Sequence, residues 1–253
     1  MLRKWQKECS EAALEKYQSG SPHFLCLASP GAGKTVMAAE VAKGMLELKL
    51  VDLIICFAPS SVVVSSIESA FSHILQRSFN GGLGAIGAAY TYHSLMYFDK
   101  SFWDALQRHR VLVVFDEIHH CSGDSLDNAN MWGREILTRV QKYACYSLAL
   151  TGTPWRTDNA PIVLSNYTNS DGKIFCDYIY GLHEAIVDSV CRKPKIALIN
   201  SNNLVYSSDE AVQRFSSIAD YLSETIASYQ SIIWHPETMK YVLKLGVKTS
   251  RNT

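Results

Sequence analysis

The stretch A-S-P-G-A-G-K-T, residues 28–35, decides the fold of this chain. A loop that cradles phosphates needs small residues, so that its N–H groups can face inward, and then a lysine and a hydroxyl group. The required residue types follow one another in order: Gly31, Gly33, Lys34 and Thr35. The usual pattern begins with glycine, and here the first position is Ala28. The stretch therefore predicts a nucleotide-binding loop.

The segments on either side agree with such a loop. Residues 23–28 (H-F-L-C-L-A) are a short apolar run that predicts a strand, and residues 34–46 have the periodicity of a helix. A helix in this place directs its free N–H groups and the positive end of its dipole at the loop. We therefore expect a strand, a loop and a helix that together bind a triphosphate, with Lys34 reaching the outer phosphates and Thr35 holding Mg²⁺.

Strands and helices alternate along the rest of the chain. Further strands are predicted by nearly continuous apolar runs at residues 52–58, 111–115 and 146–150. Helices are predicted at residues 2–17, at 61–76, in a segment ending at 108 and within 128–142. This alternation is typical of an α/β domain with a parallel sheet flanked by helices.

The composition fits a globular protein of a reducing compartment. Of the 253 residues 47% are apolar, and the formal net charge is zero, so a nucleic-acid partner would have to be held by a local groove. The seven cysteines form no C-x-x-C pair. The N-terminus lacks an apolar signal segment, and no run approaches ~18 apolar residues. We expect a cytoplasmic protein that does not associate with membranes.

Two acidic residues follow directly after the apolar run at 111–115. A buried carboxylate without a partner is costly, so packing alone does not explain them. At the carboxyl edge of a parallel sheet they can face Mg²⁺ and a water molecule. We expect Asp116 to hold the metal, and Glu117 to orient and deprotonate the attacking water. The alternative is a solvated acidic turn.

Two other patterns admit a different chemistry. G-L-G-A-I-G at residues 82–87 matches a dinucleotide fingerprint by letter, but no strand precedes it, so we interpret it as a loop. A Zn²⁺ site is conceivable at His119, His120, Cys121 and Asp124. Adjacent histidines on an extended chain point in opposite directions, however, and a second separated pair of ligands is missing.

Together these stretches resemble the first RecA-like domain of superfamily-two helicases and translocases of the DEAD/DEAH-box kind. The loop at 28–35 resembles motif I, D-E-I-H at 116–119 resembles motif II, and T-G-T-P-W-R at 151–156 resembles motif III. The combination of D-E-x-H-H with T-G-T-P-W-R is most similar to the branch with DNA repair helicases, phage recombination helicases and restriction-enzyme motor subunits. The resemblance implies a P-loop NTPase with ATP and Mg²⁺ as cofactors.

The resemblance also implies roles for individual residues. Gln6 stands 34 − 6 = 28 positions before Lys34 and would read the adenine edge, since an amide both donates and accepts hydrogen bonds. The implied catalytic residues are Lys34, Asp116, Glu117 and His119. The implied nucleotide-binding residues are Gln6, Ser29, Pro30, Gly31, Ala32, Gly33, Lys34 and Thr35. Thr151, Gly152 and Thr153 would couple the nucleotide site to the nucleic-acid face.

Two further elements resemble contacts to a nucleic-acid strand, F-A-P-S at 57–60 and T-Y-H-S at 91–94. The residues implied are Pro59, Ser60, Thr91 and Tyr92. Their N–H and hydroxyl groups would meet the phosphates of one strand, with DNA favoured over RNA. Turns capped by serine and threonine are the structural alternative.

The resemblance covers residues 2 to about 190 and predicts two domains. Residues 1–190 would form the ATP-binding domain, and residues 191–253 a connector or the incomplete start of a second domain. Within the latter, residues 195–200 resemble a strand and a helical stripe begins at 211. Related proteins hydrolyse ATP between two RecA-like domains, and the second carries a Q-x-x-G-R-x-x-R stretch that is not found after Arg156.

The predicted function is the ATP-binding core of a nucleic-acid-dependent ATPase. An arginine at the phosphates contributes on the order of 10³ to 10⁵ in rate, so we expect weak hydrolysis unless a second chain supplies the missing domain. One alternative is a nucleotide-gated binding module without turnover. Another is the motor part of a restriction or packaging machine.

Overall fold

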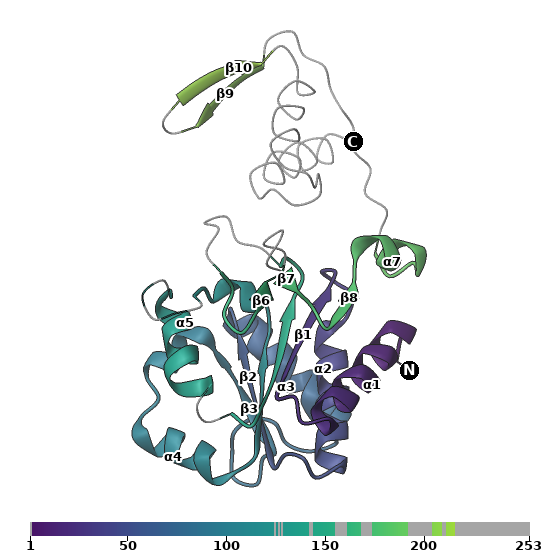
Figure 1. Cartoon of the computed structure of the whole chain (residues 1–253), viewed down its shortest axis with the longest axis vertical. Helices are drawn as coiled ribbons and strands as arrows, with labels where there is room; N and C mark the ends of the chain where they lie inside the picture. The colour runs from purple at the N-terminus through teal and green to yellow at the C-terminus, as the bar shows by residue number, and fades with distance from the viewer. Residues whose placement is uncertain are drawn as a thin grey trace. The chain divides into compact units, whose positions relative to one another are not determined.

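Six strands form one parallel sheet in the first of the chain's two units, Met1–Arg192. The computed structural model describes residues 2–123, 125, 127, 129–141, 144–154, 161–167, 174–191, 204–208 and 211–215. The sheet order is β3-β2-β4-β5-β1-β8 (Figure 1). The strands are β1 (His23–Ala28), β2 (Leu53–Ala58), β3 (Gly87–Thr91), β4 (Val111–Phe115), β5 (Tyr146–Thr151) and β8 (Tyr178–Tyr180).

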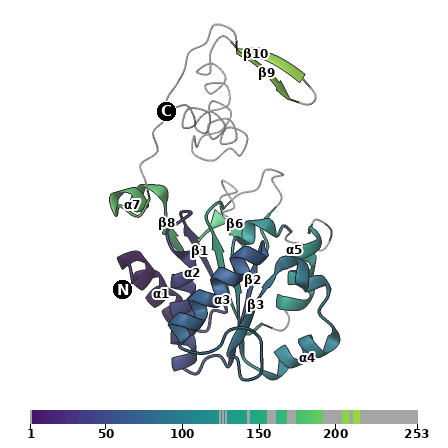
Figure 2. The same ribbon diagram turned by 180° about the vertical axis from the view of Figure 1, so that it is seen from behind.

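Helices cover both faces of this sheet (Figures 1 and 2). On one face lie α1 (Lys4–Gln18), α2 (Lys34–Glu47) and α3 (Ser61–Leu75). On the other face lie α4 (Lys100–Arg108), α5 (Met131–Glu135) and the π-helical turn η3 (Ile136–Val140). Shorter elements are η1 (Tyr92–Met96), η2 (Ile118–His120), α7 (Leu182–Val187) and the antiparallel pair β6 (Asn166–Tyr167) and β7 (Ile174–Phe175). The expected RecA-like sheet flanked by helices is confirmed.

The central strand β4 shows why the buried strands were visible in the sequence. Leu112 and Val114 pack with α1, α2 and α3. Val111, Val113 and Phe115 pack with α4 and η3. Successive side chains of a strand point to opposite faces, so a strand covered on both sides has to be apolar at every position. The predictions for β1, β2, β4 and β5 are correct to within one residue at each end.

The connections between these elements follow local rules. Ser60 caps α3 by accepting a hydrogen bond from the Val63 N–H at 3.5 Å, and Asp99 caps α4 by accepting one from the Phe102 N–H at 3.1 Å. Residues 82–86 of the G-L-G-A-I-G stretch lie in the connection between α3 and β3, as predicted for a loop. No helix within the described ranges has both the length and the apolar character needed to cross a bilayer.

In the second unit, Lys193–Thr253, the structure describes an antiparallel pair of strands, β9 (Leu204–Ser208) and β10 (Ala211–Phe215). The helical stripe predicted to begin at Ala211 is therefore wrong for residues 211–215. Apolar residues four positions apart share a face in a strand as well as in a helix, so Ala211 and Phe215 did not distinguish the two. The rest of that stripe and the strand predicted at 195–200 lie outside the described residues, and the predicted domain boundary stays a prediction.

Candidate active site

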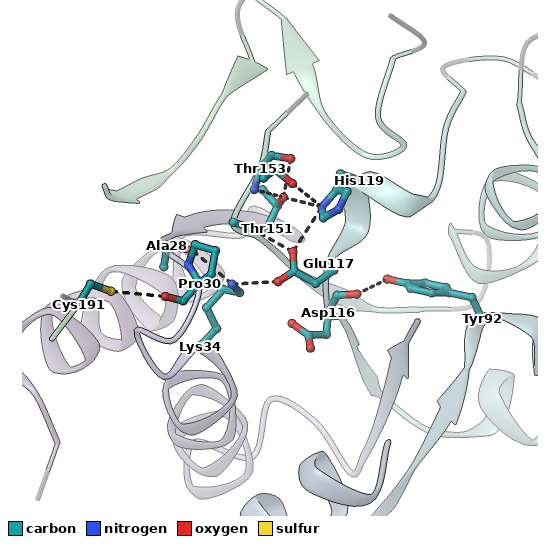
Figure 3. A network of polar contacts seen from close by, with 11 residues as sticks. Ala28, Pro30, Lys34, Tyr92, Asp116, Glu117, His119, Thr151, Thr153 and Cys191 are labelled. Atoms are coloured by element: carbon teal, nitrogen blue, oxygen red, sulfur yellow. Dashed lines mark hydrogen bonds and ion pairs between the residues drawn. The ribbon is translucent and has the colours of Figure 1, made fainter. Parts of the chain in front are cut away.

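Three neighbouring strands bring the predicted catalytic residues to one edge of the sheet. β4, β5 and β1 pair in parallel, so their carboxyl ends meet at the same edge. Ser29 follows β1, Asp116 follows β4 and Gly152 follows β5. Figure 3 shows side chains from these connections converging around Lys34 and Glu117.

The loop after β1 turns through two glycines. Gly31 has a φ of 77° and Gly33 a φ of 92°, in the left-handed region that favours glycine. Gly33 then begins α2, whose first two residues are Lys34 and Thr35. The N–H groups of a first helical turn have no acceptor within the helix and remain available to an anion. Ser29 and Ala32 of the same loop are buried, whereas Pro30 is exposed.

Lys34 lies at the centre of the site. Its side chain is buried, and its Nζ is 3.0 Å from Glu117 Oε1 and donates a hydrogen bond to the Ala28 carbonyl at 3.2 Å. A Cβ atom added at Gly152 would lie 3.3 Å from Lys34 Nζ and 3.2 Å from the Pro30 ring. The turn after β5 therefore packs directly on the phosphate-binding loop, and a side chain there would have to displace Pro30 or Lys34 slightly.

Glu117 is held from several sides. Its Oε2 accepts a hydrogen bond from the Gly152 N–H at 3.2 Å and lies 3.3 Å from His119 Nδ1. Burial acts to raise the pKa of Glu117, but the charge and hydrogen bond of Lys34 outweigh it, and the pKa is lowered. The carboxylate is therefore ionised at neutral pH, which a general base requires. The backbone φ of Glu117 is 51°, which is unusual for a residue other than glycine. Backbone strain of this type clusters at functional sites.

Asp116 has the features of a metal ligand. It is 8% exposed, and its buried Oδ1 has no hydrogen-bond partner among the described residues. Burial and, next, repulsion from Glu117 raise the pKa of Asp116 to about 6. A divalent cation would supply the missing charge, and Mg²⁺ needs only one or two protein ligands beside phosphates and water. The half-buried Thr35 at the start of α2 is the second residue that fits this ion.

The zinc alternative finds no support at this edge. Within the part of the chain that the structure describes, no group of three or more His, Cys, Asp and Glu residues could hold a metal ion. Asp124 of the conceivable set lies outside the described residues. His119 instead faces the turn after β5.

The predicted coupling residues are joined to the acidic motif by His119. Its Nδ1 lies 3.0 Å from Thr151 Oγ1 and 3.2 Å from Thr153 Oγ1. Thr151 Oγ1 also donates to the Thr153 carbonyl at 2.9 Å and accepts from the Thr153 N–H at 3.1 Å. Hydrogen bonds through His119 therefore link this turn to η2.

Gln6 lies against the phosphate-binding loop and is buried. Its Nε2 donates to the Gly33 carbonyl at 2.9 Å, and its Oε1 accepts from the Arg3 N–H at 2.9 Å. The Arg3 guanidinium donates to the Ala32 carbonyl. Sequence reasoning missed Arg3, because its contact joins residues 29 positions apart in the chain. Both polar ends of Gln6 are occupied, so adenine recognition would require an exchange of partners.

The residues predicted to contact nucleic acid follow β2 and β3, which are neighbours in the sheet. Ala58 pairs with Thr91 at the ends of β2 and β3. Pro59, Ser60 and Thr91 therefore lie side by side at the same edge of the sheet. Ser60 is exposed, and Thr91 is half-buried. This places them on the same sheet edge as the nucleotide loop, on the far side of β4.

Tyr92 has a different position from the other three. Its side chain is fully buried, and its hydroxyl donates a hydrogen bond of 2.9 Å to the main-chain carbonyl of Asp116. The hydroxyl is thus used inside the protein, and a phosphate could meet only the main chain at this position. Tyr92 directly joins the connection after β3 to the acidic motif, which the sequence pattern did not reveal.

Comparison with known proteins identifies the family. A family model described as "Type III restriction enzyme, res subunit" matches residues 1–156. An uncharacterized protein of Mycobacterium leprae (strain TN), ML1624, is 30% identical over 234 aligned residues, and the match covers 88% of this chain and 37% of that protein. An uncharacterized protein of Mycobacterium tuberculosis (strain CDC 1551 / Oshkosh), MT2985, is 34% identical over 203 aligned residues, and the match covers 76% of this chain and 32% of that protein. The chain thus spans about a third of these relatives.

A solved structure agrees on the fold. The ATP-dependent Type ISP restriction-modification enzyme LlaBIII bound to DNA is similar with a TM-score of 0.50 and 11% identity, over 75% of this chain and 15% of that one. The Sulfolobus solfataricus SWI2/SNF2 ATPase core in complex with dsDNA has a TM-score of 0.49 and 18% identity, over 61% and 32%. The family match covers the phosphate-binding loop, the acidic pair and the threonine turn, and this chain belongs to the type III restriction enzyme res subunit family of superfamily-two, helicase-like ATPases.

Proposed function

We propose that this chain is the ATP-binding core of a nucleic-acid-dependent ATPase of the helicase or translocase type. The observation that carries the proposal is the meeting of Lys34 Nζ, the Glu117 carboxylate and the Gly152 N–H at one sheet edge, at 3.0 and 3.2 Å. A lysine, a general base and a turn that leads toward the nucleic-acid face are the parts that coupled phosphoryl transfer needs.

The residues of the site would act in a defined order. Lys34 exchanges the Glu117 carboxylate for the outer phosphates, and Glu117 is then free to accept a proton from the attacking water. Thr35 and Asp116 would hold Mg²⁺, which neutralises phosphate charge when it is bound. Whether the Gly152 N–H keeps its hydrogen bond to Glu117 would depend on this exchange. The turn after β5 would therefore respond to a bound nucleotide.

Nucleic acid is the proposed partner, with DNA favoured over RNA because the family is that of a restriction-enzyme subunit. Pro59, Ser60 and Thr91 would contact one strand through main-chain N–H and hydroxyl groups. Residues 157–253 contain no Q-x-x-G-R-x-x-R stretch, so we propose that hydrolysis by this chain alone is slow and that a second RecA-like domain accelerates it.

Binding of ATP in the presence and absence of Mg²⁺ tests this proposal. Lys34→Ala is expected to abolish Mg²⁺-dependent binding, whereas Lys43→Ala, which removes an exposed lysine of the same helix, should leave it intact. ATP affinity unchanged in Lys34→Ala would remove the nucleotide site. Turnover measured with single- and double-stranded nucleic acid then separates an ATPase from a binding module that does not hydrolyse ATP.

A second candidate is the motor part of a restriction machine, and the family match favours it. In that case the chain would translocate along DNA on behalf of a nuclease located elsewhere. Movement of a labelled duplex end by the complete assembly, absent in the Lys34→Ala variant, is the expected result.

A further inference from the structure

The short helix η1 presents an aromatic pair on its outer side. Tyr97, directly after η1, is 71% exposed, and His93 is exposed as well. The Tyr97 hydroxyl lies 3.2 Å from His93 Nε2, and the two ring centroids are 5.1 Å apart. Tyr92 and Leu95 of the same helix are buried. The helix is therefore anchored on its inner side while the two rings project from its outer side.

η1 is anchored by ring packing and by a hydrogen bond. The Tyr92 ring stacks with Phe57 and with Trp132, whose ring centroids are 6.3 and 5.5 Å away. Its hydroxyl is fixed by the hydrogen bond to the Asp116 carbonyl. Aromatic side chains on a rigid backbone lose little conformational entropy when they bind a partner. The pair of His93 and Tyr97 is thus prepared for binding.

The aromatic pair lies on the sheet edge that carries the proposed strand contacts. Thr91 ends β3 opposite Ala58 at the end of β2, and Ser60 caps the helix that follows β2. Val62 in the first turn of that helix is 79% exposed. Exposed apolar surface therefore accompanies the hydroxyl groups at two neighbouring connections.

The charge of these two connections is unusual for a nucleic-acid contact. Residues 59–66 and 91–98 contain no Lys, Arg, Asp or Glu. Ion pairing with phosphates usually supplies much of the affinity for nucleic acid and makes binding depend on salt. These segments cannot supply it. Stacking of a base on an aromatic ring contributes affinity without charge and without sequence preference.

We propose that Tyr97 and His93 form a stacking platform for an unpaired base of a single nucleic-acid strand. The inference rests on the proposed function and specifies its substrate, a strand with unpaired bases rather than an intact duplex. The strand would run past Ser60 and Thr91 and place one base on the Tyr97 ring. Tyr92 connects the platform to the residue expected to hold the metal.

Fluorescence anisotropy with short labelled oligonucleotides tests the platform on the full chain. The ligands are a deoxyribo strand, the matching ribo strand, the duplex and an abasic strand with the same number of phosphates. Tyr97→Ala is expected to weaken binding of both base-containing single strands about 5- to 100-fold, and Tyr97→Phe should retain wild-type affinity. Leu83→Ala is the matched control, because Leu83 is fully exposed in the connection before β3, at the opposite sheet edge.

Several further results are expected. All variants should bind the abasic strand equally weakly, and single-strand binding should depend only slightly on salt concentration. Equal wild-type affinity for abasic and base-containing strands would overturn the platform, as would tighter binding of the duplex or an unchanged affinity in Tyr97→Ala. A preference for the deoxyribo or the ribo strand would show whether the unpaired base belongs to DNA or to RNA. Either result is compatible with the platform.

Nucleotide binding measured on the same preparations separates the two proposals. Normal Mg²⁺-ATP binding in Tyr97→Ala shows that the variant is folded. If ATP binds but the affinity for the strand does not depend on its bases, the platform proposal is wrong and the ATPase proposal is retained. If strand binding depends on the bases but ATP does not bind, the ATPase proposal is wrong and the platform proposal is retained.

Discussion

Lys34 Nζ lies 3.0 Å from Glu117 Oε1, so the residue expected to hold the outer phosphates is paired with the residue expected to be the general base. The pair balances the charge of the buried Lys34 against that of the half-buried Glu117. Removal of one partner leaves the other without compensation. Under the proposed function, a bound nucleotide would compete with Glu117 for the lysine. Nucleotide binding and activation of the base would then both follow from one exchange of partners.

Glu117→Gln should separate these consequences. The glutamine keeps the shape and can accept the Gly152 hydrogen bond, but it offers neither a charge for Lys34 nor a base. We expect ATP affinity to be retained or increased, and nucleic-acid-stimulated turnover to fall about 10²- to 10⁴-fold. Calorimetric binding and steady-state hydrolysis check this, with the exposed Glu47→Gln as control. Wild-type turnover in Glu117→Gln would mean that another group is the base.

Asp116→Asn should stabilise the protein without nucleotide. The pKa of Asp116 is raised from 3.8 to about 6, so the folded state binds a proton that the unfolded state has already released. The contribution to stability is complete below pH 3.8 and is lost as the pH rises through about 6. The neutral asparagine avoids this loss, and at pH 8 we expect it to be more stable by about 1–3 kcal/mol.

Urea unfolding in Mg²⁺-free buffer between pH 5 and 8 measures this gain. The advantage of Asp116→Asn should grow with pH, and a pH-independent difference would contradict the assignment to ionisation. Added Mg²⁺-ATP should stabilise the wild type and not the variant, because the substitution removes the expected metal ligand.

Gly33→Ala and Gly31→Ala form a matched pair. Both glycines have a positive φ, so either alanine is strained by about 1 kcal/mol or more. A Cβ at Gly31 meets nothing within 4 Å, whereas at Gly33 it would lie 2.7 Å from Gln6 Nε2. Gly33→Ala should therefore destabilise the protein more in urea unfolding. The additional loss should shrink in the Gln6→Ala background, and equal costs in both backgrounds would show that Gln6 is not the obstacle.

Gln6→Ala should reduce discrimination between nucleotide bases. A paired amide contact to a base contributes about 1–3 kcal/mol, so ATP affinity should fall roughly 5- to 100-fold while GTP affinity changes little. Arg3→Ala is the control, because Arg3 holds the same loop at Ala32 and should affect both nucleotides alike. Competition binding measures both affinities. An equal loss of ATP and GTP in Gln6→Ala would assign Gln6 to loop support alone.

The elements that were predicted well are those whose environment is the same on both faces. β4 and β5 are covered by helices on each side, so the apolar run is uninterrupted in β4 and is broken in β5 only by Ser147 before the final Thr151. β3 was not predicted as a strand, because G-A-A-Y-T is short and begins with three small residues. Gly87 has to be small, since a Cβ there would lie 2.0 Å from the Ile54 carbonyl. β8 has three residues and is too short to show a period.

The site was predictable to the extent that parallel topology determines it. Residues that follow neighbouring strands must meet at one edge, and Lys34, Asp116 and Glu117 do so. Contacts between distant segments had no such signal. Arg3 reaches Ala32 across 29 positions, and Tyr92 uses its hydroxyl inside the protein although the pattern T-Y-H-S resembles a surface contact.

The position of β1 in the sheet has a consequence for the order in which the domain is made. β1 is the first strand to leave the ribosome, yet its two partners are β5 and β8, the last strands of the sheet in chain order. A nascent chain that ends before Tyr146 contains the whole phosphate-binding loop without either strand that flanks it. The proposed nucleotide site is thus completed only after most of this sheet has been synthesised.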